Sequence, residues 1–362
     1  MTDETAACRR SEGRAAARRL ALPVLAVGLA ATVVVSLAVG PAAVSLGDLV
    51  EVAASALAGE TGDAAAMTRE RVILLDIRLP RTILGCLVGA ALAVAGAMMQ
   101  GLFRNPLADP GLVGVSAGAA LAAVATIVLG GVVGLEVAGH LAVYALPISA
   151  FLGGLATTLV LYAIATRRGR TSVATMLLAG IAIAALTGAL TGYLIFLSDD
   201  SELRDFTFWS MGSLGGATWA HVVALLPFVA LVLAAIPLIA QALNALLLGE
   251  AEAFHLGHEP QRLKRRVVVA TAAATGGAVA AAGVIGFVGI VVPHLLRVAF
   301  GPDHRLLLPG CALLGAMLVV AADTFARTVV APAELPIGIV MAVIGAPVFL
   351  SILLRRRSII DL

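Results

Sequence analysis

Long apolar runs separated by short polar or basic segments are the dominant pattern along the chain. Residues 82–103 contain no charged side chain, end at Arg104-Asn105-Pro106 and lead into a second apolar run that is rich in Gly and Ala. A helix rises 1.5 Å per residue, so about 22 residues span the roughly 30 Å hydrocarbon core of a bilayer. This stretch therefore predicts a membrane hairpin of two helices.

Ten such runs can be placed along the chain. They cover approximately residues 20–39, 82–103, 112–133, 141–165, 173–197, 219–243, 267–283, 285–300, 306–326 and 336–354. The run 285–300 is short and contains Pro293, so the number of crossings depends on it. Ten crossings place 18 of the 24 basic residues on one side of the membrane, whereas nine crossings place only 14 there. Because cytoplasmic loops carry the excess of Lys and Arg, we predict ten crossings with both termini in the cytoplasm.

The pattern predicts a single all-α, polytopic membrane domain over residues 20–354. Residues 1–19 are polar and basic and form a cytoplasmic N-terminal tail, and residues 355–362 form a cytoplasmic C-terminal tail. The apolar run after the first tail is longer than the core of a cleaved signal peptide, so we interpret it as a retained helix. Residues 40–77 carry six acidic side chains and form an external segment, in which residues 44–57 suit a helix along the surface.

Small residues recur at every fourth position in two of the predicted helices. One stripe comprises Gly85, Gly89, Ala93 and Ala97, and the other comprises Gly180, Ala184, Gly188 and Gly192. Such stripes allow helix backbones to approach closely within a membrane. We expect the first helix to be buried among others, and the second to pack closely or to line a cavity.

Composition agrees with a membrane protein and narrows its chemistry. The chain is 60% hydrophobic and 13% charged, which is more apolar surface than one soluble core of 362 residues can bury. The three cysteines are scattered, and His255 and His258 lack a third ligand nearby, so a metal site is not expected. Residues 114–118 fit the GxSxG motif of hydrolases, but a Pro-Gly turn precedes them instead of a strand. We therefore expect no enzymatic activity.

The sequence also limits how transport could be powered. The only lysine, Lys264, lies in a basic run, so the chain has no GxxxxGK(S/T) phosphate loop and another chain would have to bind ATP. The helix interiors are almost free of ionisable residues; the exceptions are His294 and Asp323. Ion-coupled transporters usually keep such groups at membrane depth, which makes an ion-coupled secondary transporter the weaker alternative.

Several short motifs, in a fixed order, resemble those of one family, the FecCD-like permeases of type II ABC importers. The motifs are RLPR from Arg78, GAMMQ from Gly96, NPLADPG from Asn105, GVSAG from Gly114, GFVG from Gly286, VPH from Val292, LPG from Leu308 and ELPIG from Glu334. The resemblance covers approximately residues 20–357. It implies a permease without a cofactor of its own, in a bacterial inner membrane.

The resemblance also implies the partners and the cargo. A second copy of the chain would form the translocation path along the shared axis, between the two copies of helix 173–197. Two cytoplasmic ATPase subunits would use the ATP, and an external substrate-binding protein would deliver the cargo. Haem is the first choice of cargo and a ferric siderophore the second, with vitamin B12 as an alternative within the family; no nucleic acid is expected.

Three arginines at the predicted outer side suggest a docking surface. Arg78 and Arg81 lie at the start of the second helix, and Arg327 lies at the outer end of the ninth. In a homodimer they would present six guanidinium groups to acidic residues of a docking protein, as the resemblance also implies. The alternatives are snorkelling at the interface and, for Arg327, an i,i+4 pair with Asp323.

At the predicted inner side the resemblance implies a gate at Asn105, Leu107, Thr171 and Ser172. From the residues alone these positions are helix breaks and caps, and Ser172 is a good N-cap candidate.

The polar loop 244–266 is the candidate for coupling to the ATPase. Its central part suits two short helices that turn at Gly257, with Glu250, Phe254 and Leu256 available to the partner. The alternative is an ordinary solvated loop.

Overall fold

The computed structural model describes residues 2–42, 45–57, 69–133, 142–167 and 170–360. Within these ranges the chain is helical apart from connecting segments and one antiparallel pair of two-residue strands, in which Thr166 pairs with Thr171. The elements are α1 (Thr2–Ala38), α2 (Leu46–Leu57), α3 (Arg69–Val72), the π-helix η2 (Ile73–Arg78), α4 (Leu79–Phe103), the 3-10 helix η3 (Pro110–Val113), α5 (Val115–Val133), α6 (Ala142–Ala165), β1 (Thr166–Arg167), β2 (Arg170–Thr171), α7 (Val173–Leu197), α8 (Asp200–Ser210), α9 (Trp219–Leu248), α10 (Glu250–His255), α11 (Pro260–Ala282), α12 (Val288–Phe300), α13 (His304–Val329) and α14 (Ile337–Ile360).

Each of the ten predicted membrane runs coincides with a helix. Six helical segments of the described chain are long and apolar enough to cross a membrane, and three more apolar helices are shorter. The tenth, α11, begins with a basic turn before its apolar part. The predicted all-α polytopic fold is therefore confirmed.

Four boundaries differ from the sequence prediction. Helix α1 begins at Thr2, so the predicted N-terminal tail continues the first membrane helix, and α14 likewise extends to Ile360. The polar stretch 198–218 contains α8, which starts with a capping box formed by Asp199 and Glu202. The second short helix predicted after Gly257 is instead the start of α11.

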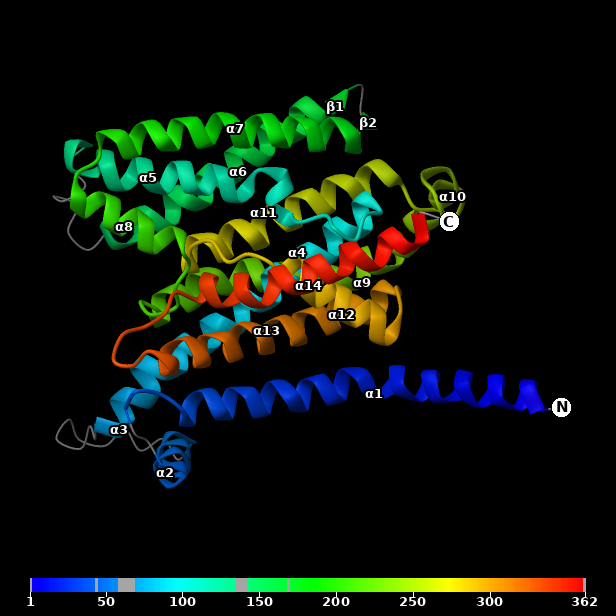
Figure 1. Ribbon diagram of the computed structural model, residues 1–362, viewed down its shortest axis with the longest axis horizontal. Coiled ribbons are helices and arrows are strands. Elements are labelled where there is room, and N and C mark those ends of the chain that lie inside the picture. The colour runs from blue at the N-terminus through cyan, green and yellow to red at the C-terminus, as the bar shows by residue number, and fades with distance from the viewer. Residues whose placement is uncertain (1, 43–44, 58–68, 134–141, 168–169, 361–362) are drawn as a thin grey trace.

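Both chain ends lie at one end of the bundle, together with α10 and the β1–β2 hairpin (Figure 1). We call this the terminal end, and the opposite end, which carries α3, α8 and the α13–α14 turn, the distal end. Helix α12 has 13 residues and is only about 20 Å long. The segment between α11 and α12 starts at the distal end and runs part of the way back toward the terminal end (Figure 1). This segment and α12 together traverse the bundle. The shared position of the two ends fits an even number of crossings.

Helix α4 forms the centre of the bundle, as the first small-residue stripe predicts. Most of its side chains are buried against α9, α11, α12 and α13. A Cβ atom at Gly89 would overlap the carbonyl oxygen of Gly315 on α13, so glycine at both positions permits this close crossing.

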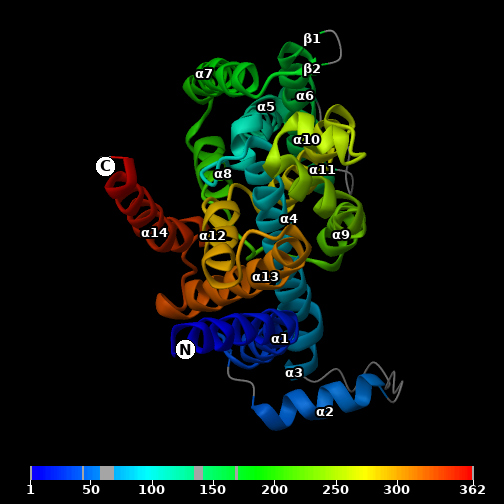
Figure 2. The same ribbon diagram turned by 90° about the vertical axis from the view of Figure 1, so that its right-hand side faces the viewer.

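Helices α7 and α14 lie on an open side of the molecule (Figure 2). Large apolar side chains of α7, such as Leu178, Ile181 and Leu186, are exposed. A Cβ added at Gly188 or Gly192 would meet nothing within 4 Å in this chain. Gly180, at the start of the second stripe, is buried, whereas Ala184, Gly188 and Gly192 are exposed and face away from the helices of their own chain.

Candidate functional site

The three arginines predicted to dock a partner lie at the distal end, but they are buried. None of Arg78, Arg81 and Arg327 is more than 7% exposed. The Arg78 guanidinium donates hydrogen bonds to backbone carbonyls at the end of α1 and just after it, including that of Ala38 at 3.0 Å. This arginine therefore joins the start of α4 to the end of α1.

Arg81 is held by two carboxylates that lie far away in the sequence. Its Nη2 and Nε atoms donate to the two oxygens of Asp323 on α13, at 2.8 and 3.0 Å, and its Nη1 donates to Glu334 Oε1 at 2.8 Å. Arg327 lies 3.9 Å from the same Asp323 carboxylate and donates to the carbonyl and hydroxyl oxygens of Ser36 on α1. The cluster thus connects α1, α4, α13 and the segment before α14.

The expectation that these arginines present free charge at the surface is therefore wrong. Burying a guanidinium is costly unless it is paired and hydrogen-bonded, and the chain supplies those partners itself. The alternative of an i,i+4 pair between Asp323 and Arg327 is present in the structure. Docking at the distal end stays a prediction.

At the terminal end, α10 lies between α9 and α11. Gly257, with a φ of +84°, permits the turn into α11, and Pro260 begins that helix. Phe254 and Leu256 are 64% and 60% exposed, so this segment presents two apolar side chains to its surroundings. The predicted turn at Gly257 is confirmed.

Lys264 connects α10 to the hairpin that precedes α7. Its ammonium group is 2.8 Å from Glu250 Oε1 and donates a hydrogen bond of 2.9 Å to the carbonyl oxygen of Thr171. The backbone N–H of Thr171 donates to Gln261 Oε1, also at 2.9 Å. We call these four residues the Lys264 link. Lys264 is only 3% exposed, and these partners compensate its buried charge.

The predicted gate residues form two separate local groups. Ser172 caps α7 by accepting a hydrogen bond of 3.3 Å from the backbone N–H of Thr175, which confirms it as the N-cap. After α4, Asn105 Oδ1 accepts a hydrogen bond of 3.0 Å from the backbone N–H of Leu107. Asn105 is exposed and Leu107 half-buried. Within the described ranges no hydrogen bond joins the two groups.

A second junction at the terminal end joins α9 to α13. Asn244 Oδ1 accepts from the backbone N–H of His304 at 2.9 Å, and Asn244 Nδ2 donates to Asp303 Oδ1 at 2.7 Å. Burial alone would raise the pKa of Asp303, but hydrogen bonds from the backbone N–H of Arg305 and the side chain of Asn244, together with the nearby Arg305 and His304 side chains, keep this pKa below its usual value. Asn244 thus holds the last turns of α9 before α10.

No pattern in the sequence points to Gln261 or Asn244, and Lys264 stands out only as part of a basic run. A signal for Lys264 was available, because the single lysine of the chain stands among three arginines at the start of an apolar helix. Its partners could not be identified, since Thr171 lies 93 residues away.

Comparisons with known proteins agree with this architecture. A model of the FecCD transport family matches residues 28–355. The hemin transport system permease protein HmuU of Yersinia pestis is 49% identical over 290 residues, which cover 79% of this chain and 84% of that protein. The cobalamin import system permease protein BtuC of Halobacterium salinarum is 47% identical over 289 residues, covering 80% and 75%. The vitamin B12 import system permease protein BtuC of Salmonella typhimurium is 46% identical over 290 residues, covering 79% and 85%.

A solved structure gives the same result for the fold. It is described as an inward-facing conformation of a metal-chelate type ABC transporter and superposes with a TM-score of 0.78. The two chains are 31% identical, and the match covers 92% of this chain and 98% of the other.

Proposed function

The chain belongs to the FecCD transport family and is the multi-pass permease subunit of an ABC importer, and from this premise we propose that it imports an iron chelate, with haem as the first choice. The observation that carries this choice is the 49% identity to a hemin permease over most of that protein. Two cobalamin permeases follow at 47% and 46%, so vitamin B12 is the second candidate cargo, beside a ferric siderophore.

The family implies that the permease works with separate ATPase and binding-protein subunits, and that ATP is hydrolysed by the partner ATPase. We infer that two copies of this chain form the translocation path between their α7 helices. The exposed apolar face of α7 supports this arrangement, because it finds no partner within its own chain.

We infer further that the terminal end faces the cytoplasm. The first turns of α11 and α13, which carry basic side chains, lie at this end. Cytoplasmic segments of membrane proteins carry an excess of positive charge, which supports this orientation. The distal end would then receive the binding protein. There Arg78, Arg81 and Arg327 would keep the docking surface in shape by holding the ends of α1, α4 and α13 together.

The coupling step would begin at α10. Phe254 and Leu256 are exposed and suited to a groove of the ATPase, as in other helix-in-groove contacts. A displacement of Glu250 on α10 would act on Lys264 and, through it, on the backbone of Thr171.

Thr171 and Ser172 precede α7, so the Lys264 link would transmit ATPase movement to the start of the pathway helix. Asn105 and Leu107, in the turn after α4, would complete the cytoplasmic gate.

The test is transport into sealed vesicles that contain the permease with its ATPase and binding protein. Uptake of haem should need ATP and both partners, and should survive a protonophore. Haem should stimulate ATP hydrolysis more than a ferric siderophore or cobalamin does. Stimulation by cobalamin alone would replace the proposed cargo, whereas uptake driven by an ion gradient without ATP would contradict the function itself.

A further inference from the structure

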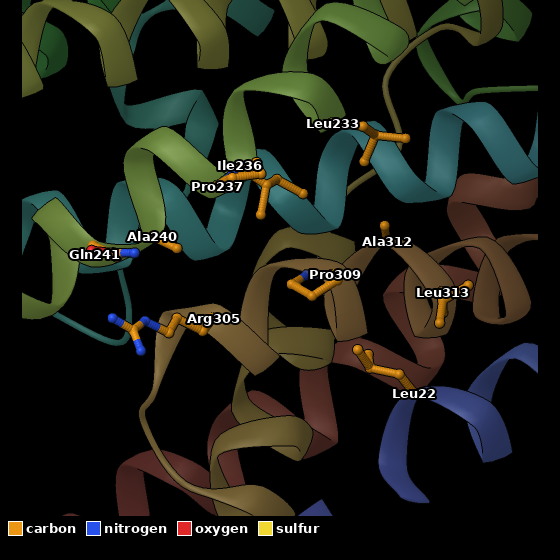
Figure 3. Close-up of a pocket in the computed structure, with 10 residues that line it drawn as sticks. All are labelled: Leu22, Leu233, Ile236, Pro237, Ala240, Gln241, Arg305, Pro309, Ala312 and Leu313. Carbon is orange, nitrogen blue, oxygen red and sulfur yellow. The ribbon is translucent and has the colours of Figure 1, made fainter. Parts of the chain in front are cut away.

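Two apolar grooves lie on opposite sides of α9. The first has a volume of about 650 Å³ and lies between α1, α9 and α13. The second has a volume of about 290 Å³ and lies between α9 and α11. Figure 3 shows the first groove, which is lined mainly by aliphatic side chains and prolines. In the second groove Leu231 and Leu238 are 63% and 71% exposed, so this groove opens at the outer surface of the helix bundle.

The polar groups of both grooves lie at the terminal end. In the first groove they are Gln241 of α9 and Arg305 in the first turn of α13, and the Arg305 side chain extends toward Gln241 (Figure 3). In the second groove they are Arg265 and Arg266 in the first turns of α11. Each groove is therefore apolar along its length and positively charged at the terminal end.

The guanidinium groups of these arginines are available to a ligand. Arg265, Arg266 and Arg305 are exposed and form no salt bridge with any residue that the structure describes. The carboxylate of Asp303 lies near Arg305 in sequence, but one of its oxygens already accepts from Asn244 and from the backbone N–H of Arg305. No acidic residue lines either groove.

We propose that each groove binds an anionic phospholipid, whose acyl chain lies along α9 and whose phosphate is held by the arginine side chains. The aliphatic wall suits a hydrocarbon chain, and a guanidinium binds phosphate oxygens with two parallel hydrogen bonds. Basic pockets between membrane helices on the cytoplasmic side recognise lipid head groups in this way. Because only Gly249 separates α9 from α10, lipids on both sides of α9 would hold the helix that carries the coupling segment.

A third groove provides an internal comparison. It has a volume of about 250 Å³, lies between α6, α9 and α11, and is lined by aromatic and aliphatic residues together with His221, without any arginine or lysine. It should accept acyl chains without preference for a charged head group. The selectivity for anionic lipid therefore depends on the arginines rather than on apolar shape.

The full-length protein, purified in a mild detergent, tests the proposal by native mass spectrometry. The probe is an equimolar mixture of phosphatidylglycerol and phosphatidylcholine with identical acyl chains. Wild-type protein should retain phosphatidylglycerol preferentially. Arg305→Gln should reduce that preference about fivefold at one site, and Arg265→Gln with Arg266→Gln should reduce it further at the other, since each arginine near the surface is worth roughly a factor of five.

Two sets of variants control the measurement. Arg262 lies in the first turn of α11, outside the grooves, and its charge is paired with Glu259. Arg262→Gln should therefore leave lipid retention unchanged. Arg265→Lys, Arg266→Lys and Arg305→Lys keep the positive charge and should keep most of the preference for phosphatidylglycerol. Equal retention of the two lipids by wild-type protein, or an equal loss of phosphatidylglycerol in Arg262→Gln, would overturn the proposal.

Discussion

At the scale of single residues, this protein stabilises its few buried charges with partners from its own chain. Lys264 is surrounded at the terminal end by Glu250 and the Thr171 carbonyl, and Arg81 is surrounded at the distal end by Asp323 and Glu334. Removing one partner of a buried charge leaves the other without compensation, which is more damaging than losing an exposed ion pair. We therefore expect these positions to be sensitive to substitution.

The residue-scale prediction concerns Lys264. Lys264→Met keeps much of the side-chain volume but removes the hydrogen bond to Thr171 and the ion pair with Glu250. Hydrogen bonds to charged groups are worth roughly 1.5–3 kcal/mol, so we expect cargo uptake per ATP hydrolysed to fall about tenfold. The measurement compares uptake and ATP hydrolysis in vesicles that contain the assembled transporter.

Arg262→Gln is the matched control, because Arg262 is exposed and, among the residues that the structure describes, its salt bridge is with Glu259 one turn earlier. The ratio of uptake to hydrolysis should stay at its wild-type value in this variant. An unchanged ratio in Lys264→Met would show that the link does not connect α10 to the gate.

At the scale of elements, two helices with similar small-residue stripes have opposite environments. The stripe of α4 faces α13, where Gly89 and Gly315 bring the two backbones together. The stripe of α7 meets nothing in its own chain at Gly188 and Gly192. The same sequence pattern therefore contributes to packing within the chain in one helix and is available for a contact outside the chain in the other.

The element-scale prediction compares alanine substitutions in the two stripes. Gly89→Ala places a methyl group against the backbone of α13, which cannot move as a flexible side chain would. We expect a loss of about 1–3 kcal/mol in stability, the usual cost of overpacking, seen as a lower melting temperature in detergent. Gly188→Ala should melt at nearly the wild-type temperature in the isolated chain. Equal melting temperatures for the two variants would contradict the assigned packing.

At the scale of the whole molecule, α7 and α14 leave an open face that would suit the second copy of the chain proposed above. Exposed apolar side chains on α7 include Leu186, Leu190 and Tyr193, near the middle and distal part of the helix. A second copy placed against this face would enclose a path along the membrane normal. Docking, gating and coupling would then act at opposite ends of the same path.

The whole-molecule prediction concerns this contact between copies. In a variant without native cysteines, single cysteines at Leu186, Leu190 or Tyr193 should form disulfide-linked dimers under mild oxidation in membranes. Leu238→Cys on α9 is the control, because that side chain is also well exposed but lies on a groove away from α7. Dimer formation at position 238, together with none at the three α7 positions, would place the interface elsewhere. Electrophoresis without reductant measures the outcome.

The sequence by itself determined the helical architecture, because hydropathy and the positions of basic residues are local properties. The ten runs, the limits of α7, the turn at Gly257 and the family all follow from residues that are close together in the chain. Only the tertiary structure decided which charges are free. Arg81 pairs with Asp323 across 242 residues, and Lys264 reaches Thr171 across 93. Whether a charged side chain is exposed or compensated depends on the packing of distant helices, and no local pattern contains that information.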